Sequence, residues 1–161
     1  MKNKTKNRLK KKWQNLPLHH IDTCVVIEVL MKGDDYLSCE NYLNKVGYKY
    51  RGTLSVSALG EIFMYLTKDI KEEIDRGEAF TIASRLIDKR KIDFSSPQFK
   101  TYVIVEKIKT IESRAEPMDS LNLATAIAND ASVFVTMDAT LLGNYKLESV
   151  FKIKIKHPGE L

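Results

Sequence analysis

Several features that define common protein classes are scarce or absent in this sequence of 161 residues. It has 7 glycines and 4 prolines, too few for a collagen-like or low-complexity chain. No apolar run approaches the roughly 20 residues that span a bilayer, and no apolar stretch of signal-peptide length follows the charged N-terminus. With 43% hydrophobic residues, the chain is expected to be a single globular unit without membrane insertion, located in the cytoplasm.

Cysteine is scarce as well. The two cysteines, Cys24 and Cys39, belong to no Cys-x-x-Cys or Cys/His pattern of the kind that binds zinc. Cys24 lies in an apolar run and is expected to be a buried free thiol, which is consistent with a reducing compartment.

Positive charge is concentrated at the N-terminus. The formal net charge is +5, but residues 1–12 carry seven bases and no acid, which leaves 19 bases and 21 acids for the remainder. We therefore predict a basic N-terminal arm over residues 1–17 and one domain over residues 18–161. The arm either attracts RNA phosphates in a salt-sensitive way or is a disordered, solubilising terminus.

Short apolar runs alternate with helical patterns throughout the domain. Strands are expected over residues 18–22, 53–56, 91–94, 132–137 and 150–155. Helices are expected over residues 35–46, 57–67, 77–89, 96–115 and 118–129, with Ser57 and Ser96 as N-caps. Strands separated by helices predict a mostly parallel sheet covered on both faces, a three-layer α/β/α sandwich.

Four acids occupy positions where such a sheet gathers ligands. Asp22 and Asp138 end apolar strands, whereas Glu61 and Asp119 lie near the beginnings of helices. Open parallel sheets bind ligands at the carboxyl ends of their strands, where the following helices also begin, so all four acids are expected to converge. Taken singly, Asp119 is explained as a helix-start acid and Glu61 as a solvent-facing residue.

Four carboxylates in one crevice repel one another unless a cation neutralises them. Oxygen-only ligand sets suit Mg²⁺ or Mn²⁺, and the chemistry that such a site supports is metal-assisted phosphoryl transfer. The sequence contains no Walker loop, no Gly-x-Gly-x-x-Gly pattern and no candidate Ser/His nucleophile pair that would favour another mechanism.

Four segments in order resemble the motifs of PIN-domain nucleases: residues 21–27, 57–61, 116–126 and 133–138. The ending over residues 157–161 is also similar to the usual terminus of the family. The resemblance implies a Mg²⁺- or Mn²⁺-dependent endoribonuclease that hydrolyses RNA. Its catalytic and metal-binding residues would be Asp22, Glu61, Asp119 and Asp138.

The same resemblance implies partners. Family members commonly homodimerise, and many bacterial and archaeal members are VapC-type toxins held inactive by an antitoxin protein. Two positions depart from the family pattern: Cys24 replaces a usual Ser or Asn, and Thr140 stands where an acid is frequent. Thr23 and Thr136 are hydroxyls that orient carboxylates or a metal-bound water, or else ordinary strand threonines.

Two other functions stay open. One is a catalytically weakened PIN domain that binds RNA or a protein, and the other is a small-molecule phosphatase or nucleotide hydrolase, which the missing phosphate-binding glycine loop disfavours. Tyr42, Tyr48 and Tyr50 are expected either to stack on RNA or, as a helix face plus a turn, to pack against a neighbouring subunit. His19 and His20 are expected at the surface or the sheet edge.

Overall fold

The computed structural model describes residues 13–90 and 92–161, so residues 1–12 of the predicted arm lie outside the described residues. Twelve strands and α-helices follow one another in the described chain: β1 (Leu18–Ile21), α2 (Thr23–Met31), α3 (Tyr36–Leu43), β2 (Arg51–Ser55), α4 (Val56–Asp69), α5 (Glu73–Arg90), β3 (Asp93–Ser95), α6 (Phe99–Ile111), α7 (Pro117–Ala128), β4 (Val133–Val135), α8 (Tyr145–Phe151) and β5 (Lys154–Lys156). A short 3₁₀ helix, η1 (Pro158–Glu160), ends the chain.

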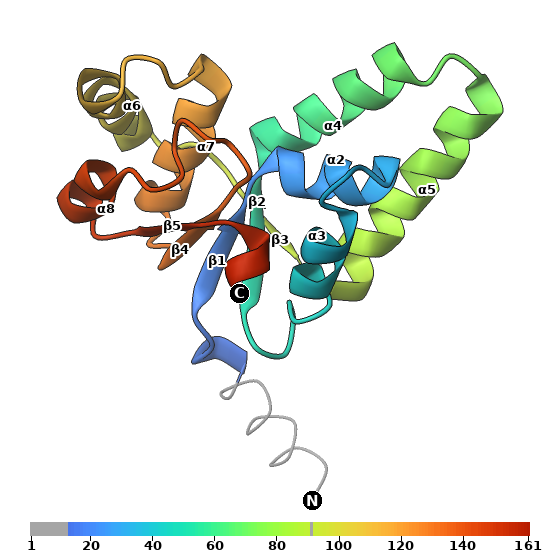
Figure 1. Cartoon of the computed structure of the whole chain (residues 1–161), viewed down its shortest axis with the longest axis horizontal. Helices are drawn as coiled ribbons and strands as arrows, with labels where there is room; N and C mark the ends of the chain where they lie inside the picture. The colour runs from blue at the N-terminus through green and yellow to red at the C-terminus, as the bar shows by residue number, and fades with distance from the viewer. Residues whose placement is uncertain (1–12, 91) are drawn as a thin grey trace, which may run out of the picture.

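The five strands form one parallel sheet in the order β3-β2-β1-β4-β5. In Figure 1, α2 to α5 lie on one side of the sheet and α6 to α8 on the other. This arrangement confirms the predicted α/β/α sandwich. In addition, α4 and α5 run alongside each other as a pair that extends away from the sheet (Figure 1).

The strand order determines where a ligand site can form. β1 is the central strand, where His20 stands opposite Thr53 of β2 on one side and Phe134 of β4 on the other. The chain adds β2 and β3 on one side of β1 and then returns to add β4 and β5 on the other side. At such a reversal the carboxyl ends of the two adjacent strands, here β1 and β4, border a crevice that open α/β sheets use for ligands.

Each face of the sheet has its own hydrophobic core. Ile21, Val26 and Leu54 belong to the core beneath α2 to α5, whereas Phe134 and Leu123 belong to the core beneath α6 to α8. All five side chains are fully buried, and complete burial of a large apolar side chain contributes about 1.5–3 kcal/mol to stability. The two cores fix the sheet between its helical layers.

The first strand ends where the sequence predicts, but the apolar residues after Asp22 form a helix that the sequence analysis missed. Asp22 is the N-cap of α2, with φ −77° and ψ 156°, and its Oδ1 accepts the Thr23 N–H at 2.9 Å. Val25 and Val26 are β-branched and so favour strands slightly, but both are completely buried in this helix. Burial against the sheet therefore overrides the local preference.

Both predicted N-caps are wrong by two residues. Ser55, not Ser57, caps α4, because Ser55 is in an extended conformation and its Oγ accepts the Ala58 N–H at 2.9 Å. The helix predicted from residue 96 begins at Phe99, with Gln98 as N-cap. The Gln98 N–H donates to Thr101 Oγ1 at 2.8 Å, which satisfies a backbone donor that the helix itself leaves free.

The last predicted strand is shorter than expected. Val150 and Phe151 belong to α8, a helix that was not predicted because residues 150–155 alternate in polarity as a strand does. Asn144 caps this helix through its Oδ1, which accepts the Leu147 N–H at 3.2 Å, and Lys152 ends it in the left-handed conformation. β5 therefore begins only at Lys154.

The two histidines of β1 are buried, which contradicts the expected surface or edge position. His19 is 2% exposed and His20 0%, because β1 is the central strand and is covered on both faces. The His19 ring stacks on Tyr50 at a centroid distance of 4.0 Å and on Tyr42 at 5.9 Å. Tyr42 is completely buried, so the structure places it within the domain and removes it from the surfaces that RNA can reach.

Three other features bear on the sequence predictions. Cys24 is a half-buried free thiol and Cys39 a buried one. Residues 13–17 of the predicted arm contact the domain, since the Arg51 guanidinium lies 5.5 Å from the centre of the Trp13 ring and the Arg51 N–H donates to the Pro17 carbonyl at 2.9 Å. Among the described residues, no helix combines the length and apolar character required to cross a bilayer.

Candidate functional site

Asp22 stands at the centre of the candidate site, directly after β1. Its side chain is buried, and protein donors contact both of its oxygens. Oδ1 accepts the Thr23 N–H at 2.9 Å, whereas Oδ2 accepts the Thr136 hydroxyl at 2.7 Å and the Cys24 thiol at 3.4 Å. Burial raises the Asp22 pKa above its ordinary value, the hydrogen bonds from Thr136, Thr23 and Cys24 oppose that rise, and the charge of Glu61 adds to it.

Glu61 is linked to Asp22 through Thr23 and Asn122. The Thr23 hydroxyl donates to Glu61 Oε2 at 2.6 Å, and Asn122 Nδ2 donates to the same oxygen at 3.0 Å. Asn122 Nδ2 also donates to Asp22 Oδ1 at 3.2 Å. The side-chain amide of Asn122, on α7, therefore donates to two carboxylates: that of Asp22, directly after β1, and that of Glu61, on α4.

Asn122 is a site residue that the sequence analysis did not single out. It is 1% exposed, and its Oδ1 accepts the hydroxyls of Ser55 at 2.6 Å and Ser57 at 2.9 Å. The signal for it was its spacing: Asn122 follows Asp119 by three residues on the same helix and therefore shares its face. Ser57, predicted as a helix cap, belongs to this hydrogen-bond network instead.

Asp119 lies in the first turn of α7, as predicted, and is half-buried. Its pKa is raised to about 7, chiefly by burial and then by the charges of Asp22, Asp138, Glu116 and Glu61. Each of those neighbours is an acid, so the electrostatic environment of Asp119 disfavours its ionised form.

Asp138 follows β4, the strand that pairs with β1 where the strand order reverses. Its N–H donates to Thr136 Oγ1 at 3.0 Å, and the same hydroxyl donates to Asp22, so Thr136 connects the ends of the two strands. Asp138 Oδ1 accepts the N–H groups of Thr140 at 2.6 Å and Leu141 at 3.0 Å. One carboxylate oxygen of Asp138 therefore stabilises the turn that follows it.

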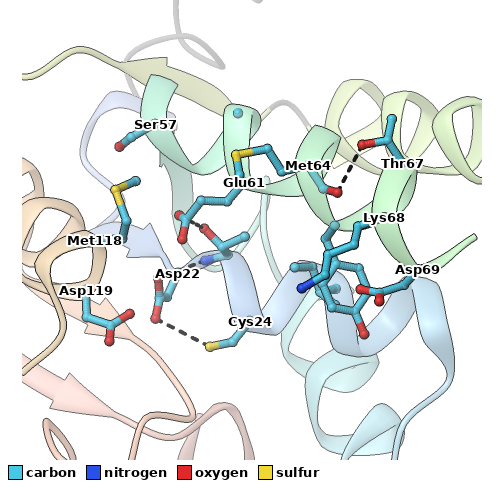
Figure 2. Close-up of a pocket in the computed structure, with 14 residues that line it drawn as sticks. Asp22, Cys24, Ser57, Glu61, Met64, Thr67, Lys68, Asp69, Met118 and Asp119 are labelled. Carbon is cyan, nitrogen blue, oxygen red and sulfur yellow. Dashed lines mark hydrogen bonds between the residues drawn. The ribbon is translucent and has the colours of Figure 1, made fainter.

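A cleft of about 910 Å³ passes over these groups. Asp22, Glu61 and Asp119 line it, together with Thr23 and Cys24. Figure 2 shows the carboxylates of Glu61 and Asp119 directed towards the region of Asp22, with Lys68 and Asp69 farther along the cleft. Asp138 does not line the cleft, but it is close enough to Asp119 for its charge to raise the Asp119 pKa.

Three of the four predicted acids, Asp22, Glu61 and Asp119, thus share one cleft, whereas Asp138 lies outside its lining and near Asp119. Among the side chains of residues 13–72, 75–90 and 92–161, the only ion pairs are Arg114–Glu112 and Lys156–Glu160, so none of the four acids is paired with a base there. In the same part of the chain, no three Asp, Glu, His or Cys side chains are close enough together to hold a metal ion as they stand. The donor chemistry, carboxylate oxygens without a compensating base, fits a hard divalent cation.

The sequence model of the PIN domain family matches residues 20–146, which include all four acids. This chain belongs to the PIN domain family. PIN domains are generally nucleases and typically depend on divalent metal ions. No curated protein matches the sequence closely enough to be compared with it.

Solved structures of PIN proteins share the fold. A chain of VapBC2 from Rickettsia felis, solved with a DNA fragment from its promoter, has a TM-score of 0.63 and 17% identity over 87% of this chain and 98% of its own length. A chain of FitAcB from Neisseria gonorrhoeae has a TM-score of 0.64 and 14% identity over 89% of this chain and 99% of its own. A chain of FitAB bound to an IR36 DNA fragment has a TM-score of 0.62 and 13% identity, with 89% and 96% covered.

Proposed function

We propose that this PIN domain is a Mg²⁺- or Mn²⁺-dependent endoribonuclease that hydrolyses RNA phosphodiester bonds. The observation that carries the proposal is the arrangement of Asp22, Glu61 and Asp119 along one cleft without an ion-paired base among the described residues. Uncompensated negative charge in a partly buried site is costly unless a cation offsets it. Asp138 adds a fourth negative charge beside Asp119.

In the proposed mechanism, acidic side chains would bind the metal and threonine hydroxyls would orient these acids. The proposed metal ligands and catalytic residues are Asp22, Glu61, Asp119 and Asp138. A divalent cation held by them would supply Lewis-acid stabilisation of charge on the scissile phosphate and lower the pKa of the attacking water. Thr136 and Thr23 orient Asp22 and Glu61 by their hydroxyl hydrogen bonds, which is the supporting role predicted for them.

The raised pKa of Asp119 sets a condition on metal binding. Burial and the neighbouring acids raise this pKa to about 7 in the absence of a cation, so a divalent cation and a proton would compete for the Asp119 carboxylate near neutral pH. Asp22, by contrast, is surrounded by donors on both oxygens and is suited to a fixed orienting role.

The experiment is a cleavage assay with a panel of structured and single-stranded RNAs, in Mg²⁺ or Mn²⁺. We expect wild-type protein to cut RNA, and Asp22→Asn and Asp138→Asn to lose at least about 100-fold in rate, a typical effect of removing a group that stabilises the transition state. Asp130→Asn is the matched control, because Asp130 is exposed and lies outside the cleft. Equal cleavage by all variants would indicate a contaminating nuclease and contradict the proposal.

One alternative function has specific support, namely a catalytically weakened PIN domain that binds RNA or a protein. Two observations favour it. Among the described residues, no three Asp, Glu, His or Cys side chains are close enough together to bind a metal ion, and the Cys24 thiol donates a hydrogen bond to an Asp22 oxygen that a metal would need. RNA binding without metal-dependent cleavage under any condition would select this alternative.

We further propose two protein partners. The solved relatives come from complexes named VapBC2 and FitAB, which supports a role as the toxin of a toxin–antitoxin pair, with an antitoxin partner. A homodimer is supported by the exposed apolar side chains of α6, where Phe99 is 101%, Tyr102 70% and Val103 65% exposed. Co-expression with the product of an adjacent reading frame tests the first partner, and light scattering of the purified chain tests the second.

A further inference from the structure

The residues that follow Asp138 form part of a second, smaller cavity. Ala139 and Thr140 line this cavity of about 300 Å³ together with Arg114, from the loop between α6 and α7, and Lys146, from the beginning of α8. Because the Thr140 N–H donates to Asp138 Oδ1, a single turn joins the cavity to the candidate site.

Glu112 holds the walls of this cavity together. Its carboxylate accepts Arg114 Nε at 2.9 Å and Nη2 at 3.1 Å, which is a bidentate pair, and Asn144 Nδ2 at 3.3 Å. The Glu112 side chain is only 12% exposed, whereas that of Arg114 is 76% exposed. A mostly buried acid therefore connects the Arg114 loop with the residues that begin α8.

The positive charge that Glu112 does not neutralise is suited to binding a phosphate. A guanidinium has five N–H donors, and Arg114 directs two side-chain nitrogens at Glu112, so further donors face away from that pair. Lys146 is exposed and contributes a second positive charge, so the two cations exceed the single charge of Glu112. Thr140 is uncharged and adds no negative charge to the wall.

An aromatic ring lies beside these cations. Tyr145 is 73% exposed and lines both this cavity and an adjoining one of about 470 Å³, which also shares Ile111 and Lys146. Exposed aromatic rings next to cationic groups are the usual means by which proteins hold single-stranded nucleic acids, through base stacking and phosphate contacts.

We propose that Arg114, Lys146 and Tyr145 form a nucleotide subsite for the RNA substrate on the Asp138 side of the cleft. Arg114 and Lys146 bind a backbone phosphate, and Tyr145 stacks on the adjoining base. The subsite rests on the proposed ribonuclease function and adds a specific role to it. Its cations offset the repulsion that the four carboxylates exert on an approaching RNA strand.

The test is equilibrium binding of a short fluorescent single-stranded RNA, measured by anisotropy over a range of salt concentrations without divalent cations. We expect the double variant Arg114→Ala/Lys146→Ala to bind at least about tenfold more weakly. Its slope of log K against log salt should also fall by about 0.7, the contribution of one phosphate contact on a single strand. Tyr145→Ala should weaken binding by about tenfold, whereas Tyr145→Phe, which keeps the ring, should not.

Lys89→Ala is the matched control, because Lys89 is an exposed lysine on α5 that lines neither cavity. Circular dichroism establishes that each variant is folded. If wild-type protein binds and cleaves RNA but the double variant behaves like Lys89→Ala, the subsite is wrong and the ribonuclease function stands. If wild-type protein neither binds nor cleaves RNA, both proposals are wrong.

Discussion

Asn122 and Asp22, 100 positions apart in the sequence, share a buried hydrogen bond of 3.2 Å, and the same amide nitrogen lies 3.0 Å from Glu61 Oε2. Asn122 is the only neutral side chain in the described residues that donates to both carboxylates through one nitrogen. It therefore separates two negative charges that would otherwise repel each other at close range.

Replacing Asn122 should affect both stability and the site. Asn122→Asp exchanges the shared donor for a third carboxylate, so we expect a loss of about 3 kcal/mol or more in the free energy of unfolding. Asn122→Ala leaves Ser55 and two carboxylates short of a partner and should cost about 1–3 kcal/mol. Urea unfolding without divalent cations measures both values. Equal stability of the two variants would show that the charge separation has no energetic role.

Divalent cations should stabilise the folded protein if the acids bind them. A ligand present at 100 times its dissociation constant adds about 2.7 kcal/mol to the free energy of unfolding. We expect Mg²⁺ or Mn²⁺ to raise the melting temperature of wild-type protein and to leave that of Asp22→Asn nearly unchanged, and EDTA to reverse the gain. Differential scanning fluorimetry at several cation concentrations provides the measurement, and a similar rise in both proteins would place cation binding elsewhere.

Asp119 should make stability fall as pH rises. Its pKa is about 7 in the folded protein and 3.8 in its ordinary state, so between these values the unfolded chain binds fewer protons than the folded one. The free energy of unfolding without divalent cations should therefore decrease from about pH 4 to about pH 7 and level off above that. In Asp119→Asn this component should disappear, and urea unfolding at pH 5 and pH 8 detects the difference. An unchanged pH dependence in the variant would mean that Asp119 titrates normally.

The proposed activity should have the opposite pH dependence. Metal binding requires the ionised form of Asp119, so at limiting Mg²⁺ cleavage should increase as pH rises through about 7. Saturating Mg²⁺ should move this rise to lower pH, because the cation competes with the proton. A pH profile that does not respond to the cation concentration would argue against Asp119 as a ligand.

His20 should make the protein sensitive to acid. Both ring nitrogens are buried without a protein partner among the described residues, and burial lowers the His20 pKa to about 3. The unfolded chain takes up this proton near pH 6.5, so the free energy of unfolding should decrease as pH falls from about 6.5 towards 3. His20→Leu should remove this component and, by eliminating an unsatisfied buried group, add about 1 kcal/mol or more at pH 7.

His19→Leu is the matched comparison for His20. His19 is also buried, but its Nδ1 lies 3.2 Å from the Tyr42 hydroxyl and the two groups share a hydrogen bond. Its replacement deprives Tyr42 of that partner and should not stabilise the protein. Guanidinium unfolding of the two variants at pH 5 and pH 7 separates the effects, and a destabilised His20→Leu would show that the ring has a partner in solution.

The sequence by itself determined the architecture and led to the prediction of the four acids. Local patterns in the sequence show where strands end and helices begin. Asp22 and Asp138 follow apolar runs, and Glu61 and Asp119 lie near the beginnings of helices, so all four acids could be picked out from such patterns. The parallel sheet follows from the alternation of strands with helices, because parallel neighbours need a crossover. The PIN motifs are local as well, so the family could be identified from short segments.

Only the tertiary structure decided which side chains serve the acids. Asn122 and Thr136 reach Asp22 because the order β3-β2-β1-β4-β5 places β4 and α7 beside the end of β1, and pairing between distant segments leaves no mark on local sequence. The same central position of β1 buries His19 and His20. The helix after Asp22 was missed for a related reason, since Val25 and Val26 favour strands locally and are helical because burial against the sheet outweighs that preference.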